Sequence, residues 1–306
     1  MNLMCCERLT PDSNFGYRDP VIFEEERVLD NLLQEEDMTI PSCNYFESVQ
    51  KELKPFMRKV VVSWMLEVCE EQKCENQIFP LSINFLDRFL CVCPIKTTQL
   101  QILGASCLLV SSKVRQCHAL SVDLLCDYTE NSITPKDLLD WEMLLLSKLS
   151  WRLTAITGYD VMDHMIHRLA WSRDDVALRS HSQSMIAFCC IELDWMRCKP
   201  SLLASASLVA AASGLKMGSL PDLIPQVCHL SNSNPDQVHW IVLQLERMIA
   251  ESVEITLKVP VRSSSPDSNL PPNKMAAAAT EQVLSPSGAA ENQQPTTPTD
   301  VQEVHF

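Results

Sequence analysis

The stretch Leu103-Gly-Ala-Ser-Cys-Leu-Leu-Val-Ser-Ser-Lys113 is the most informative about the fold, because it returns without a gap as Leu203-Ala-Ser-Ala-Ser-Leu-Val-Ala-Ala-Ala-Ser213. The quartet Thr134-Pro-Lys-Asp137 returns at the same offset as Asn234-Pro-Asp-Gln237. Each quartet has a capping side chain, a proline at the first helical position and an acceptor at the third, which marks the start of a helix. An offset of this length indicates a duplicated helical domain, because solenoid repeats have periods of about 20 to 50 residues.

The two copies are predicted to contain five helices each, at equivalent positions. The first five are expected at 53–74, 78–92, 97–113, 120–127 and 135–149, and the second five at 158–170, 177–196, 200–215, 219–229 and 235–256. In both copies the third helix is rich in Gly, Ala and Ser. Small residues let neighbouring helices approach closely, so we expect this helix to be the hub of its bundle.

The chain is therefore expected to be all-α, with two bundles at 53–152 and 153–257. Residues 1–19 should be flexible, and residues 20–52 should hold an acidic amphipathic helix at 21–37 followed by a linker. Residues 258–306 are rich in Pro, Ser and Thr, as in Ser263-Ser-Ser-Pro266. Such a segment buries too little apolar surface to offset the entropy of ordering, so it is predicted to be a disordered tail.

Composition excludes several classes of function. The net charge of −14 and the lack of any basic run argue against a nucleic-acid partner. The fourteen cysteines form no C-x-x-C pair and the start of the chain shows no secretory signal, so residues such as Cys69 and Cys107 are expected to be small buried hydrophobes in a reducing compartment. No apolar stretch is long enough to span a membrane. A phosphate-binding loop and a recognisable metal-ligand set are also missing, and His164 and His167 fit an ordinary helix face, so no cofactor, metal or enzymatic activity is expected.

The two copies differ at four positions that carry charge in the first. Arg58, Asp87, Lys113 and Glu142 correspond to Gly158, Ala187, Ser213 and Val242. Because the second copy folds without these charges, the first copy is expected to keep them for another purpose. Arg58 and Asp87 could brace two helices as a bidentate pair, or form a solvated ion pair of little consequence.

The segment Met57-Arg-Lys-Val-Val-Val-Ser-Trp-Met-Leu-Glu67 closely resembles the opening helix of the cyclin box. The resemblance continues through Leu86-Asp-Arg-Phe-Leu90, Leu100-Gln-Ile-Leu-Gly-Ala105, Ser112-Lys113 and Glu142. It covers residues 45–152 strongly and the second copy more weakly. The segments 67–75 and 128–133 resemble those of a D-type cyclin in particular. The fold that this implies is two tandem five-helix cyclin-box bundles.

The resemblance implies a regulatory subunit, itself no enzyme, that binds and activates a cyclin-dependent kinase of the D-type-cyclin class. It would act in the nucleus and cytoplasm and promote the transition into DNA synthesis. The kinase-binding positions that it implies are Lys113, Glu142, Arg58 and Asp87, of which the first two face the kinase. The family typically continues after the lysine with a basic and then an acidic residue. Here Arg115 keeps the base and Gln116 replaces the acid, which concerns one contact at the rim.

A second surface is expected from Met57, Val61, Trp64, Glu67, Leu100 and Gln101. The first three lie at i, i+4 and i+7, which is one stripe of a helix and could equally be plain core. By resemblance this stripe belongs to a groove that receives Arg-x-Leu peptides from substrates and from kinase inhibitor proteins. Val60 and Val61 replace a bulkier Ile-Leu pair, which is expected to weaken peptide binding.

Two short motifs lie near the ends of the chain. Leu3, Cys5 and Glu7 fit the L-x-C-x-E motif that docks on retinoblastoma-family proteins, and alternate residues of an extended strand can enter one groove together. The alternative is a chance match.

Thr297, Pro298 and Thr299 resemble a D-type phospho-degron, in which phosphate on Thr297 would create a site for a ubiquitin ligase receptor. The alternative is an incidental Thr-Pro in a proline-rich tail.

Another class of protein, the general transcription factors, also contains two tandem cyclin folds. Such a protein should show a basic DNA-facing surface and usually a zinc ribbon. The composition and the cysteine spacing provide neither.

Overall fold

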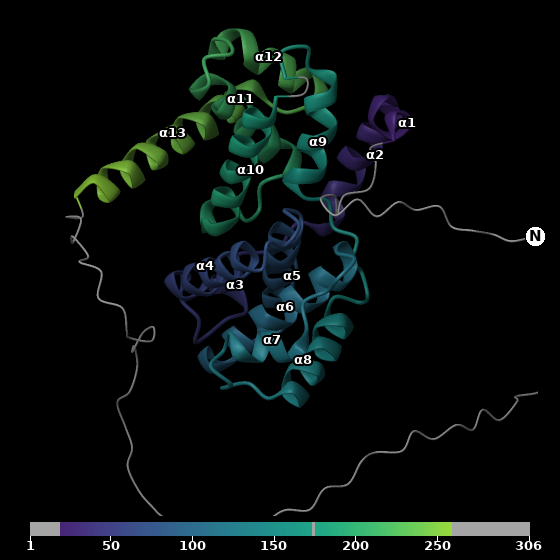
Figure 1. Ribbon diagram of the computed structural model, residues 1–306, viewed down its shortest axis with the longest axis vertical. Coiled ribbons are helices and arrows are strands. Elements are labelled where there is room, and N and C mark those ends of the chain that lie inside the picture. The colour runs from purple at the N-terminus through teal and green to yellow at the C-terminus, as the bar shows by residue number, and fades with distance from the viewer. Residues whose placement is uncertain (1–18, 173–174, 259–306) are drawn as a thin grey trace, which may run out of the picture. The chain divides into compact units, whose positions relative to one another are not determined.

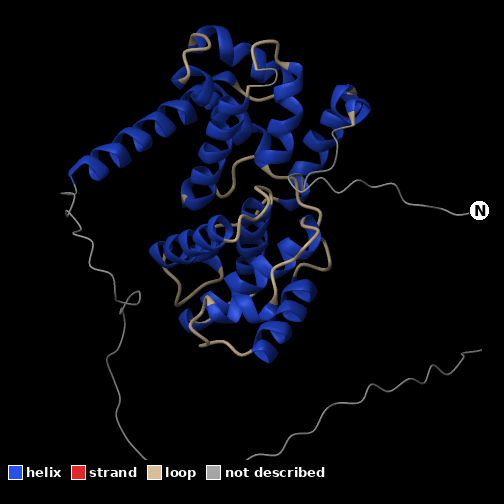
Figure 2. Ribbon diagram, viewed as in Figure 1, coloured by secondary structure: helices blue, strands red, loops and turns tan. Residues whose placement is uncertain are grey.

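The computed structural model describes residues 19–172 and 175–258, and throughout these ranges the regular structure is helical, without strands (Figure 2). The first bundle contains α4 (Pro55–Glu71), α5 (Ile78–Val92), α6 (Leu100–Arg115), α7 (Val122–Asp127) and α8 (Pro135–Lys148). The second contains α9 (Gly158–Arg168), α10 (Val176–Ile191), α11 (Pro200–Gly214), α12 (Leu220–Ser231) and α13 (Pro235–Lys258) (Figure 1). The prediction of an all-α fold with two tandem five-helix bundles is confirmed.

Three short helices precede the first bundle, and three 3₁₀ turns join longer elements. The helices are α1 (Pro20–Glu24), α2 (Glu26–Glu35) and α3 (Tyr45–Ser48), and the turns span Glu36–Thr39, Thr97–Gln99 and Leu193–Trp195. The predicted helix 21–37 is wrong as one element, because Glu25 adopts an extended conformation and its carbonyl accepts a hydrogen bond from Arg168 Nη2 at 2.6 Å. The predicted helix 177–196 ends at Ile191, since Glu192 is also extended.

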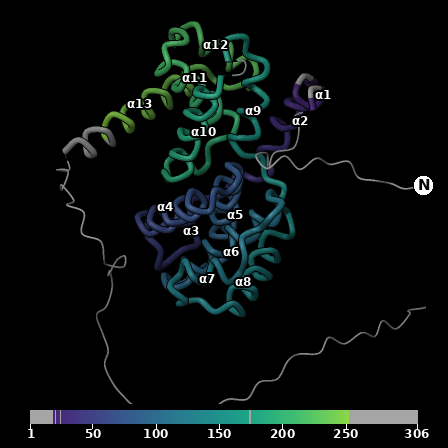
Figure 3. The backbone as a smooth tube through the Cα atoms, in the orientation of Figure 1, coloured from purple at the N-terminus to yellow at the C-terminus, as the bar shows by residue number. Residues whose placement is uncertain are grey.

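The third helix is the hub of each bundle, as predicted. Residues 102–112 of α6 are all buried, and α6 packs against α4, α5, α7 and α8. Residues 204–212 of α11 are likewise all buried, and α11 packs against α9, α10, α12 and α13 (Figure 3). Small side chains on every side of these two helices allow four neighbours to surround each one.

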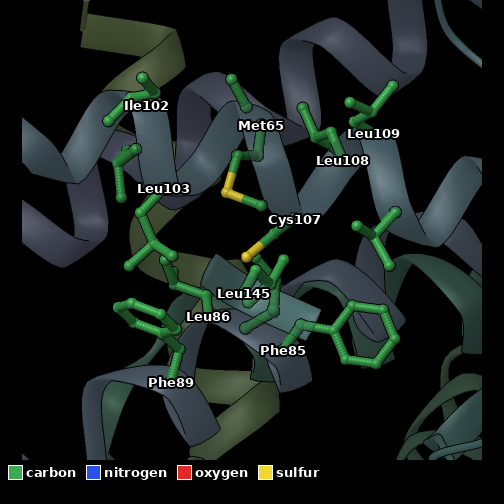
Figure 4. Packing of buried hydrophobic residues seen from close by; sticks show 14 of the residues in the cluster. Met65, Phe85, Leu86, Phe89, Ile102, Leu103, Cys107, Leu108, Leu109 and Leu145 are labelled. Carbon is green, nitrogen blue, oxygen red and sulfur yellow. The ribbon is translucent and has the colours of Figure 1, made fainter. Parts of the chain in front are cut away.

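Each bundle has its own hydrophobic core. The first core extends from Tyr45 to Ala155, and at its centre Met65 of α4 and Cys107 of α6 lie above Leu86 of α5 (Figure 4). The second core extends from Tyr159 to Leu245 and includes Leu29 of α2. The helix α2 precedes the first bundle in the chain, but it packs into the core of the second bundle.

A buried carboxylate ties the end of this N-terminal segment to the second hub helix. The two oxygens of Glu36 accept hydrogen bonds from the backbone N–H and the hydroxyl of Ser201, both at 2.8 Å, in the first turn of α11. A negative charge is favourable at the N-terminus of a helix. Burial nevertheless raises the pKa of Glu36, and the bonds from Ser201 oppose that effect only in part.

Candidate functional site

An ion pair on the surface of the first bundle joins the end of α6 to α8. Lys113 Nζ donates to Glu142 Oε1 at 2.6 Å, and the two side chains are 44% and 12% exposed. Leu139 and Met143, which share the face of α8 that carries Glu142, are 45% and 57% exposed. Contiguous apolar patches that are rimmed by polar residues mark protein–protein interaction sites.

The second bundle has no such pair at the equivalent positions. Ser213 is half-buried at the end of α11, and Val242 of α13 is completely buried in the second core. The same helices therefore pack together without the lysine and the glutamate. The fold does not explain why the first bundle keeps Lys113 and Glu142.

Arg58 and Asp87 form a second ion pair, but inside the protein. Arg58 Nε and Nη2 donate to the two carboxylate oxygens of Asp87, each at 2.8 Å, which is the bidentate geometry predicted for a brace between α4 and α5. The hydroxyl of Tyr45 also donates to Asp87 Oδ1 at 2.7 Å. Burial alone would lower the pKa of Arg58, but the carboxylate of Asp87 raises it, so the guanidinium stays charged.

The remaining donors of Arg58 connect the first bundle to the second. Nη1 donates to the carbonyl of Ile191 at 2.8 Å, and Nη2 donates to that of Cys190 at 3.0 Å. These are the last two carbonyls of α10, where the helix dipole favours a positive charge. With side-chain exposures of 2% and 4%, Arg58 and Asp87 are buried in this structure and brace the helices from inside, and their part in kinase binding stays a prediction. The sequence carried no signal for the two carbonyls, because backbone acceptors are not specific to any residue type.

An apolar groove lies between α4 and the start of α6, with a volume of about 410 Å³. Its lining includes five of the six residues predicted for the second surface, and three more: Met57, Val61, Trp64, Leu100 and Gln101, with Phe56, Val60 and Thr97. Glu67 does not line the groove; it lies exposed one turn after Trp64. Val61 and Leu100 are buried, while Phe56 and Val60 are exposed. The spacing of Phe56 and Val60 at i and i+4 could have revealed them as a second apolar stripe.

The floor of this groove depends on a glycine. A Cβ atom on Gly104 of α6 would lie 3.0 Å from Val61 Cγ2 and 3.3 Å from Met65 Sδ. Only a residue without a side chain lets α6 approach α4 this closely. The close approach places Val61 and Leu100 at the bottom of a groove between the two helices.

Some predicted features cannot be placed. The retinoblastoma-docking residues Leu3, Cys5 and Glu7 and the degron residues Thr297, Pro298 and Thr299 lie outside the described residues. In the part of the chain that is described, no group of three or more His, Cys, Asp or Glu side chains could hold a metal ion. Likewise, none of its helices combines the length and the apolar composition needed to cross a membrane.

Known proteins match this chain along its whole length. The family model of the cyclin N-terminal domain matches residues 27–154, and that of the cyclin C-terminal domain matches residues 156–279. The chain is 36% identical to the G1/S-specific cyclin-D2 of Xenopus laevis over 313 residues, with 100% of both chains covered. It is 37% identical to the G1/S-specific cyclin-D3 of Homo sapiens over 309 residues, again with 100% of both covered.

A solved structure shares the fold. The X-ray structure of a viral cyclin from herpesvirus saimiri superimposes with a TM-score of 0.66 at 23% identity. The match covers 75% of this chain and 100% of that chain. At this identity the likeness supports the arrangement of helices alone.

Proposed function

The chain belongs to the cyclin family and within it to the D-type cyclins, and we propose that it binds and activates a cyclin-dependent serine/threonine kinase and directs it to retinoblastoma-family proteins. Family membership gives the chain a regulatory role at the G1/S stage of the cell cycle, as a subunit without catalytic activity of its own.

The observation that carries the proposal is the ion pair between Lys113 and Glu142 with the exposed Leu139 and Met143 beside Glu142. A protein kinase is active only when its C-helix is placed so that an internal Lys–Glu pair can form. A rigid helical bundle packed against that helix can hold it in place. The apolar side chains would supply buried area, and the ion pair would fix the register of the interface.

A charge reversal on the exposed partner of the ion pair tests this role. Lys113→Glu places two carboxylates side by side on the proposed interface, so the kinase should no longer co-precipitate, while the circular dichroism spectrum and the melting temperature stay nearly unchanged. The matched control is Lys216→Glu, an exposed lysine that follows the hub helix of the second bundle. Normal co-precipitation of the Lys113→Glu variant would contradict the proposal, and a variant that unfolds would assign Lys113 a structural role.

The groove between α4 and α6 is proposed to hold Arg-x-Leu peptides of substrates and kinase inhibitor proteins. Its apolar lining suits a leucine side chain, and Glu67 on the same face of α4 offers a carboxylate for the arginine. Val60→Glu would put a charge on the exposed wall of the groove and should weaken peptide binding, measured by fluorescence anisotropy. Unchanged affinity would rule the groove out.

Two further proposals concern residues near the chain ends. Leu3, Cys5 and Glu7 would dock a retinoblastoma-family protein, and replacing Cys5 by Ala and Glu7 by Gln should weaken that binding while phosphorylation of a generic peptide continues.

Phosphate on Thr297, beside Pro298 and Thr299, would recruit a ubiquitin ligase receptor, in the nucleus or the cytoplasm. A cycloheximide chase in which Thr297→Ala has the ordinary half-life would exclude the second role.

A further inference from the structure

The end of α4 brings two cysteine side chains together. The helix ends at Glu71, and Lys73 adopts a left-handed conformation with φ of 50°. The N–H of Cys74 donates to the carbonyl of Cys69 at 2.9 Å, and the N–H of Lys73 donates to that of Glu70 at 3.2 Å. These two bonds define a Schellman motif, whose geometry places the side chains three positions before and two positions after the cap against each other. In α4 both positions are occupied by cysteine.

The same pair of hydrogen bonds closes three other helices among the described residues. The corresponding side chains are Cys126 and Asn131 in α7, Leu146 and Trp151 in α8, and Ala212 and Met217 in α11. None of these pairs contains two thiols. The motif is therefore a general way in which this chain ends its helices, and at α4 it creates a dithiol.

The two thiols differ in access and in chemistry. Cys69 is buried and Cys74 is half-buried, and both line a cavity of about 600 Å³. A hydrogen bond from the thiol of Cys69 lowers the pKa of Cys74, while the same contact and burial raise the pKa of Cys69. A thiolate is the reactive form of cysteine, so Cys74 is the attacking group and Cys69 is the neighbouring thiol that can form a disulfide with it.

We propose that Cys69 and Cys74 are a peroxide-sensitive dithiol that oxidises reversibly to a disulfide. In the first step the thiolate of Cys74 attacks one oxygen of hydrogen peroxide, the O–O bond breaks, hydroxide leaves, and Cys74 becomes a sulfenic acid. In the second step the sulfur of Cys69 attacks the sulfur of Cys74, and the sulfenic oxygen leaves as water with the proton of Cys69. The dithiol loses two electrons and the peroxide gains them. A small thiol reductant then reduces the disulfide back to the two thiols and is itself oxidised to a disulfide.

The position of the pair gives the oxidation a structural consequence. The disulfide would close a covalent ring over the end of α4, the helix that carries Arg58 and one wall of the groove. Asn76, two residues later, donates to Gln183 of α10 at 2.9 Å, so the ring would lie next to a contact between the two bundles. Oxidation is therefore expected to stiffen the end of α4 where it meets the second bundle.

Peptide mapping of the full chain tests the proposal. The protein is treated with hydrogen peroxide, its free thiols are alkylated with iodoacetamide under denaturing conditions, and it is digested without reduction. The peptide that spans Cys69 and Cys74 should be two hydrogen atoms lighter and carry no alkyl group, and reduction with dithiothreitol should restore both thiols. Cys126, which occupies the same position as Cys69 in α7 but faces an asparagine, should form no disulfide and serves as the internal control.

Two single substitutions separate the steps. In Cys69→Ala the sulfenic acid of Cys74 cannot be resolved, so it should accumulate and be captured by dimedone. In Cys74→Ala the thiol of Cys69 should stay reduced. The proposal is overturned if both cysteines of the unmodified sequence are recovered alkylated after peroxide, if Cys74 is joined to a cysteine elsewhere, or if Cys69 is oxidised equally well without Cys74.

Discussion

The first two helices of each bundle are joined by different interactions at equivalent positions. Where the first bundle joins its first two helices through Arg58 and Asp87, the second has Gly158 and Ala187 at the equivalent positions. A Cβ atom on Gly158 would lie 3.1 Å from Ile186 Cγ2, so α9 and α10 are in direct contact at this point. At these equivalent positions the first bundle has a buried charge pair and the second has a close apolar contact, although a partly exposed ion pair between Asp163 and Arg179 also joins α9 to α10.

The difference follows from what Arg58 does beyond its own bundle. A buried ion pair seldom stabilises a protein more than apolar residues of the same size, so its presence calls for another reason. Arg58 also donates to the carbonyls of Cys190 and Ile191 at the end of α10. A single guanidinium thus closes the first bundle and caps a helix of the second. The second bundle needs no reciprocal brace, because the first already supplies the connection.

The largest effect is expected from removing the arginine of this brace. Arg58→Met would leave the carboxylate of Asp87 buried without its partner and two carbonyls of α10 without a donor, so the free energy of unfolding should fall by about 3–5 kcal/mol. Urea denaturation followed by circular dichroism measures this. In the double variant Arg58→Met with Asp87→Leu the uncompensated charge is gone, and part of the stability should return. A loss below about 1 kcal/mol in the single variant would mean that the pair behaves like a surface salt bridge.

A smaller effect is expected from disturbing the apolar contact of the second bundle. Gly158→Ala inserts a methyl group against Ile186, a buried β-branched side chain that cannot turn away easily, so the free energy of unfolding should fall by about 1–3 kcal/mol. Gly214→Ala is the matched control, since no atom lies within 4 Å of its Cβ position at the end of α11. That variant should be neutral or gain up to about 1 kcal/mol. Equal losses in both would contradict the close-packing interpretation.

The parts of the fold that could be predicted are those that depend on local pattern. Runs of small residues predict the hub helices α6 and α11, and a capping residue followed by proline predicts the start of α8 and of α13. The helix α3 was missed, because four residues carry too little periodicity to detect. The break at Glu25 was missed because it involves a hydrogen bond from Arg168, which is far away in the sequence.

The candidate surfaces were predictable to a similar degree and for similar reasons. The stripe of Met57, Val61 and Trp64 follows from helical spacing, and the structure places all three in the groove. The partners of Arg58 beyond Asp87 did not follow, because they are a tyrosine hydroxyl and backbone carbonyls that the tertiary fold brings together. The dithiol also could not be predicted from the sequence, because it depends on the left-handed conformation of Lys73, which folds Cys74 back onto Cys69.

At Lys113 we expect the smallest effect on stability but the largest effect on kinase binding. Lys113→Ser gives the first bundle the residue that the second has at the equivalent position, and it removes an ion pair whose lysine is 44% exposed. Surface pairs contribute little, so the free energy of unfolding should change by less than about 1 kcal/mol in the same urea experiment. Kinase co-precipitation, measured on the same preparation, should be strongly reduced, because Glu142 would remain on the proposed interface without its counter-charge. A loss of stability as large as that of Arg58→Met would show that Lys113 also braces the fold, whereas unchanged binding would show that the two bundles differ at this position without consequence for the kinase.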